Sequence, residues 1–149
     1  MLKILFGLSL VFAIYRMTKV KNLAVMILTS GLVIAALWVL VAPDEFVDYG
    51  KHLYMIFVGA VVIYGVFSKQ KNPEQRLVIS LSALATITYW VWVSNHWHGN
   101  TLLPAVLILL IGAYALIRRV RLRNELGIIL IFMVDASVIL LEAWLKSRV

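Results

Sequence analysis

The chain has 149 residues, of which 63% are hydrophobic and only 14% are charged, and its mean hydropathy is +0.97. Soluble domains contain about 45–50% apolar and about 25% charged residues, so this composition excludes an ordinary soluble globule. It also excludes a disordered chain, which needs few apolar residues. The net charge of +7 comes from basic residues in short connections between apolar runs, a pattern typical of membrane proteins. No nucleic-acid partner is therefore expected.

Six apolar segments follow one another along the chain, each bounded by charged or polar residues. They are Leu2–Tyr15, Leu23–Ala42, Leu53–Ser68, Leu77–Ser94, Thr101–Ile117 and Leu126–Leu145. A hydrocarbon core about 30 Å thick needs roughly 20 helical residues, and the runs lack the alternating polarity of membrane strands. The sequence therefore predicts an all-α, polytopic integral membrane bundle. We expect one transmembrane domain, residues 1–149, with about six helices arranged as three hairpins and no soluble domain.

The first apolar segment is the shortest of the six. It contains Lys3 followed by an apolar stretch and resembles a signal peptide in this respect, but Tyr15, Arg16 and Met17 offer no small-residue cleavage site. The sequence favours a retained helix, and a re-entrant or interfacial segment is the alternative.

The basic residues fall mainly on one side of the predicted bundle. Ten of the 14 lie in the connections after the first, third and fifth segments: Arg16, Lys19, Lys21, Lys69, Lys71, Arg76, Arg118, Arg119, Arg121 and Arg123. Because cytoplasmic loops are enriched in Lys and Arg, these connections are predicted to be cytoplasmic and both termini non-cytoplasmic. The cytoplasmic (inner) membrane is the expected location.

A carboxylate lies at the centre of the last apolar segment. Placing Asp135 at mid-bilayer costs about 2.5–3.5 kcal/mol, and such residues usually face a bundle interior or a watery cavity. Glu142 follows two helical turns later on the same face. Asp135 is either a proton or solute site, with Glu142 on the exit path, or a hydrogen-bonded residue that holds neighbouring helices together.

Hydroxyl side chains on the fourth segment are the candidate partners of this carboxylate. Ser82, Thr86 and Tyr89 share one helical face, and Thr86 is expected at the depth of Asp135. The alternative is that these hydroxyls donate to backbone carbonyls of their own helix.

All three histidines map to the non-cytoplasmic side. His52, His96 and His98 would suit zinc or copper if acidic residues of the preceding connection completed the site. The alternatives are solvated loop histidines or a pH sensor. No other cofactor is expected, and the chain has no cysteine for thiolate ligands.

An arginine-rich connection precedes the last segment. Arg118, Arg119, Arg121 and Arg123 are predicted to contact anionic lipid headgroups, and docking of an acidic partner is the alternative.

No established catalytic motif is present, so the sequence favours a protein without enzymatic activity. We expect a small transporter or channel-like protein for protons, a cation or a small solute, with Asp135 as the binding or protonation site. The alternative is an accessory or assembly subunit of a larger membrane complex. Either role is compatible with a homo-oligomer.

Overall fold

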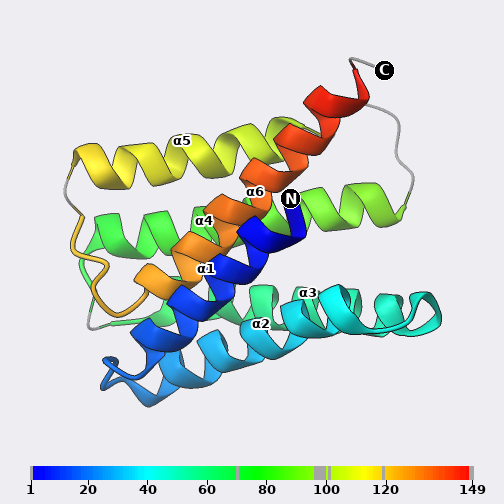
Figure 1. Cartoon of the computed structure of the whole chain (residues 1–149). Coiled ribbons are helices and arrows are strands. Elements are labelled where there is room, and N and C mark those ends of the chain that lie inside the picture. Colours follow the sequence, from blue (N-terminus) through cyan, green and yellow to red (C-terminus); the bar gives the residue numbers. More distant parts are fainter. Residues whose placement is uncertain (1, 70, 96–99, 101, 119, 148–149) are drawn as a thin grey trace.

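The computed structural model describes residues 2–69, 71–95, 100, 102–118 and 120–147, and these residues form six helices without a strand. The helices are α1 (Leu2–Met17), α2 (Leu23–Val41), α3 (Asp44–Phe67), α4 (Pro73–Ser94), α5 (Leu103–Ile117) and α6 (Leu126–Lys146). The predicted all-helical bundle is thus confirmed (Figure 1).

Four of the described helices, α2, α3, α4 and α6, are long and apolar enough to cross a membrane, as expected of an integral membrane protein. The other two are shorter, with 16 residues in α1 and 15 in α5. Large hydrophobic side chains cover the outward faces of the bundle, among them Ile34, Ile56 and Leu110. Because soluble proteins rarely expose extended apolar surface, these faces suit contact with lipid.

Two helices begin earlier than the apolar pattern predicts. Helix α3 begins at Asp44 rather than at Leu53, because Pro43 and two acidic residues in the first turn form a favourable helix start. Helix α4 begins at Pro73 rather than at Leu77, where Asn72 caps the helix in a reciprocal arrangement with Gln75. The early start of α3 places Lys51 and His52 on a helix instead of in a loop.

Each helix packs against the next one along the chain, and α6 packs against α1, which closes the ring. Helix α6 also contacts α2 and α4. In Figure 1, α1, α3 and α5 end at the same end of the bundle where α2, α4 and α6 begin. We call this the basic end, because nine of the basic residues named above lie in the described parts of its connections or at the adjoining helix ends. The opposite end is called the terminal end.

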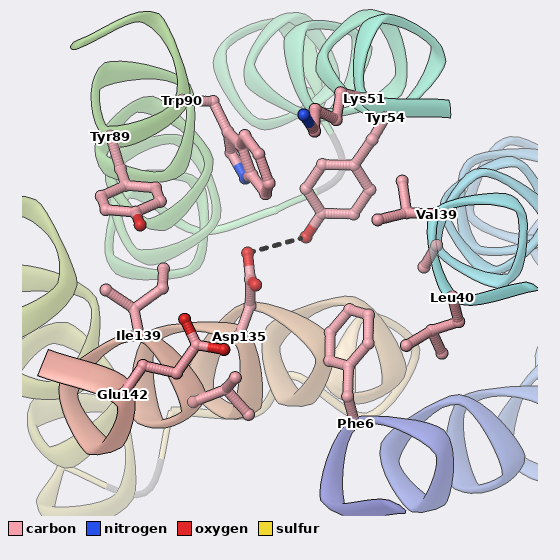
Figure 2. Close-up of a pocket in the computed structure, with 12 residues that line it drawn as sticks. Phe6, Val39, Leu40, Lys51, Tyr54, Tyr89, Trp90, Asp135, Ile139 and Glu142 are labelled. Atoms are coloured by element: carbon pink, nitrogen blue, oxygen red, sulfur yellow. Dashed lines mark hydrogen bonds between the residues drawn. The ribbon is translucent and has the colours of Figure 1, made fainter. Parts of the chain in front are cut away.

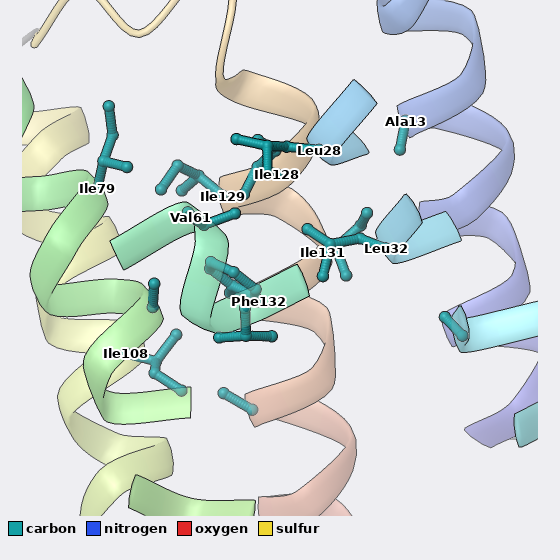
Figure 3. Packing of buried hydrophobic residues seen from close by; sticks show 14 of the residues in the cluster. Ala13, Leu28, Leu32, Val61, Ile79, Ile108, Ile128, Ile129, Ile131 and Phe132 are labelled. Atoms are coloured by element: carbon teal, nitrogen blue, oxygen red, sulfur yellow. The ribbon is translucent and has the colours of Figure 1, made fainter. Parts of the chain in front are cut away.

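The core is filled by branched and aromatic side chains, and glycines allow the helices to approach closely. Phe132 and Ile128 of α6 are fully buried with Leu32 of α2 and Val61 of α3 (Figure 3). A Cβ on Gly65 of α3 would lie 2.9 Å from the backbone nitrogen of Ser80 in α4. Membrane helices associate largely through such close packing of small residues.

We predict that Gly65→Ala destabilises the bundle, because the added methyl group meets backbone that cannot move without separating α3 from α4. Overpacking of this kind costs about 1–3 kcal/mol. Gly59→Ala in the same helix is the matched control, since its Cβ would meet only Ile87 Cδ1 at 3.8 Å. Unfolding of the detergent-solubilised variants measures the difference, and equal stability of the two variants would contradict the prediction.

Candidate functional site

A cavity of about 240 Å³ lies in the half of the bundle nearer the terminal end. Its polar lining, with the aromatic residues of α3 and α4, consists of Lys51, Tyr54, Tyr89, Trp90, Asp135 and Glu142 (Figure 2). Apolar side chains of α1, α2 and α6 complete the wall, including Phe6, Leu40 and Ile139. Because Glu142 is exposed, the cavity reaches the surface beside it.

Asp135 is buried inside the bundle, with 9% of its surface exposed. The hydroxyl of buried Tyr54 donates a hydrogen bond to Asp135 Oδ2 at 3.4 Å. This distance is long, because O–H···O hydrogen bonds usually measure about 2.7–2.8 Å. A carboxylate has about four acceptor positions, so Asp135 retains most of its capacity to bind another group.

Three aromatic rings form a row beside Asp135. Tyr54 and Trp90 lie 6.1 Å apart between ring centroids at an interplanar angle of 66°. Tyr89 and Trp90 lie 5.7 Å apart at 81°, also edge to face. Trp90 Nε1 is buried without a hydrogen-bond partner among the described residues, and Figure 2 shows this edge of the indole facing Asp135. The row therefore places aromatic surface and an indole N–H donor beside the carboxylate.

Charged side chains of α3 and α6 lie near the opening of the cavity. Lys51 Nζ pairs with Asp48 Oδ1 at 2.7 Å, one helical turn earlier in α3. The positive charge of Lys51 is thus balanced by Asp48. Glu142 adds a second carboxylate to the wall, as the spacing on α6 predicts.

The basic end of the bundle contains a buried ion pair that the sequence did not predict. Lys71 Nζ lies 2.7 Å from Glu125 Oε1, and the Tyr64 hydroxyl donates to the same oxygen at 3.0 Å. Glu125 is fully buried, and its Oε2 has no hydrogen-bond partner within the described part of the chain. The cluster joins α3, the connection before α4 and the start of α6. The sequence does contain a signal for this pair, because Glu125 is an acidic residue at the end of an arginine-rich connection.

Two of the predicted hydroxyl partners lie away from the cavity. The Thr86 hydroxyl donates to the Ser82 carbonyl at 2.9 Å on its own helix, and neither residue lines the cavity. Their helical face packs into the core, where both are buried. Tyr89 does line the cavity, whereas Tyr54 and Trp90, which the sequence analysis did not select, provide the closest surroundings of Asp135.

The predicted metal site is described only in part. His52 is exposed, and its Nδ1 lies 2.6 Å from the Asp48 carbonyl oxygen. His96 and His98 lie outside the described residues. Within the described ranges, no group of three or more His, Cys, Asp or Glu residues is placed to hold a metal ion. Zinc or copper binding stays a prediction.

The arginine-rich connection is held through its backbone. The side chains of Gln75 and Arg16 donate to the carbonyls of Arg121 and Arg123, both at 2.6 Å. The side chains of Arg121 and Arg123 are exposed at the basic end. Arg118 lies 3.6 Å from Glu74 in an exposed pair, and Arg119 is outside the described residues. Contact with anionic lipid stays a prediction.

Comparison with protein-family models, curated proteins and solved structures finds no match.

We predict that Lys71→Met destabilises the protein by about 3–5 kcal/mol, because it leaves the buried Glu125 carboxylate without a counter-charge. The double variant Lys71→Met with Glu125→Gln should recover most of this loss, since glutamine still accepts from Tyr64 and carries no charge. Denaturant titration of the purified variants measures these free energies of unfolding.

The exposed pair of Arg118 and Glu74 provides the control. Arg118→Met should change the stability by only about 0–1 kcal/mol, as is usual for surface ion pairs. A double variant that is no more stable than Lys71→Met would refute the buried-charge argument.

Proposed function

We propose that the protein is a small membrane transporter for protons, a cation or a small solute, with Asp135 as its binding or protonation site. The supporting observation is a cavity that reaches the surface at the terminal end and contains a buried carboxylate with free acceptor capacity. Ionisable residues inside a membrane bundle commonly mark substrate or proton pathways. Tyr89 and Glu142 line the route between Asp135 and the surface.

Closure of the opposite end supports transport rather than an open channel. Phe132 and Ile128 fill the core between Asp135 and the basic end, and Lys71, Tyr64 and Glu125 join the elements at that end. A solute bound at Asp135 would cross only if these contacts opened while the terminal end closed. Such alternating access is the usual mode of secondary transporters.

We further propose that the basic end faces the cytoplasm and that both termini are outside, in the cytoplasmic membrane. This orientation follows from the concentration of Lys and Arg at one end of the bundle. The cavity would then open to the outside.

An accessory or assembly subunit of a larger membrane complex is the second candidate. The exposed Arg121 and Arg123 side chains favour it, because they offer a basic surface to an acidic partner. Asp135, however, faces the interior of its own chain and is not presented to a partner's helix. This placement supports the transporter over the subunit.

We predict that purified protein in liposomes conducts protons down an imposed pH gradient and that Asp135→Asn abolishes this flux, because the amide cannot bind and release a proton. An entrapped pH-sensitive dye reports the flux. Asp44→Asn is the matched control, since Asp44 is an exposed residue at the terminal end that does not line the cavity. Absence of flux in well-folded wild-type protein, or flux unchanged in Asp135→Asn, would contradict a proton-carrying role.

The orientation is tested by single-cysteine labelling, because the natural chain has no cysteine. A membrane-impermeant maleimide should label Ser147→Cys in intact cells and label Lys69→Cys only after permeabilisation. The reverse pattern would overturn the proposed orientation.

A further inference from the structure

We infer that the ligand of the cavity beside Asp135 is a small organic ammonium cation. This inference deepens the proposed function, because it names the solute class that the transporter would carry. It rests on the charge balance of the cavity, the row of aromatic rings and the size and polarity of the remaining wall.

The charge balance of the cavity favours a cation. Among the described residues that line it, Asp135 and Glu142 are acidic and Lys51 is basic. Because Lys51 pairs with Asp48 at 2.7 Å, the Asp135 carboxylate has no cationic partner from the chain within ion-pair distance in the described structure. A bound cation would supply that missing charge, whereas an anion would meet two carboxylates.

The aromatic row favours an organic cation over a metal ion. Tyr54, Trp90 and Tyr89 are packed edge to face, an arrangement that turns their ring planes in different directions. In the proposed complex the ammonium group lies against a ring face of this row, because ring faces attract cations and aromatic surroundings are a common means of recognising quaternary ammonium groups. A metal ion would instead require several oxygen or nitrogen ligands, and no group of three or more His, Cys, Asp or Glu residues lies within the described part of the chain.

The rest of the wall suits methyl groups and a short polar tail. Phe6, Leu40 and Ile139 contribute apolar surface opposite the aromatic rings (Figure 2). The Trp90 N–H, whose edge faces Asp135, adds a donor to the polar part of the wall. At about 240 Å³, the cavity is smaller than the pockets of drug-sized ligands, which span about 300–1,000 Å³. An amino alcohol of the size of choline fits this combination.

Calorimetric titration of the purified full-length protein in detergent tests the inference with choline as the probe. Its neutral counterpart is 3,3-dimethylbutan-1-ol, in which carbon replaces the ammonium nitrogen. Choline should bind at least about tenfold more tightly than the alcohol, and Asp135→Asn should remove this preference. Trp90→Leu should weaken choline about thirty-fold, the effect of losing one desolvated cation–π contact. Asp44→Asn should leave binding unchanged.

Equal affinity for choline and the neutral alcohol, or no choline binding by folded wild-type protein, would overturn the inference. If potassium ions compete for the site as strongly as choline does, recognition of the ligand by the aromatic rings would be refuted. If Trp90→Leu does not fold, Trp90→Phe should still weaken choline, because phenylalanine is the poorer cation–π partner. Choline binding without any flux in liposomes would support this inference and contradict the proposed transport function. Asp135-dependent proton flux without choline binding would support transport and contradict this inference.

Discussion

Lipid offers no hydrogen bonds, so polar groups that this chain carries into the bundle must be satisfied among its own helices or in a water-filled space. The outward faces meet this constraint by being apolar, and the helices satisfy their own backbone groups. Several polar side chains within the helices are buried. Thr86 and Thr29 donate to carbonyls of their own helices, whereas Asp135 accepts a long hydrogen bond from Tyr54 of another helix. Among these buried polar groups, Asp135 is the one that lines the cavity.

The two ends of the bundle deal with buried charge differently. At the basic end, Glu125 has a cationic partner and a hydroxyl donor, and backbone carbonyls of the neighbouring connection accept from Gln75 and Arg16. At the terminal end, Asp135 faces a cavity and has no charged partner within ion-pair distance among the described residues. A paired charge joins elements together, while an unpaired one beside a cavity is available to a ligand. A buried carboxylate is therefore structural at one end and a candidate binding group at the other.

The sequence was most informative where a single physical rule dominates. Long apolar runs separated by charged connections predict membrane helices, and a carboxylate in the middle of a run is conspicuous because of its cost in lipid. The sequence was less informative where a residue's role depends on how its helix is rotated. Thr86 and Ser82 share a face with Tyr89 on a helical projection, yet only Tyr89 lines the cavity. Lys71 and Glu125 lie in separate connections, and no local pattern indicates that they meet.

The sequence by itself determined the class of the protein and the number and order of its helices. It also determined the gathering of basic residues at one end and the central position of Asp135 in its segment. Each of these follows from local composition and from the length of a membrane-spanning helix. Only the tertiary structure decided what surrounds that carboxylate. Tyr54 and Trp90 reach it from α3 and α4, and the helix start at Asp44 brings Lys51 to the cavity wall. These relations depend on helix rotation and packing between segments far apart in the chain, which the apolar pattern of any one segment does not encode.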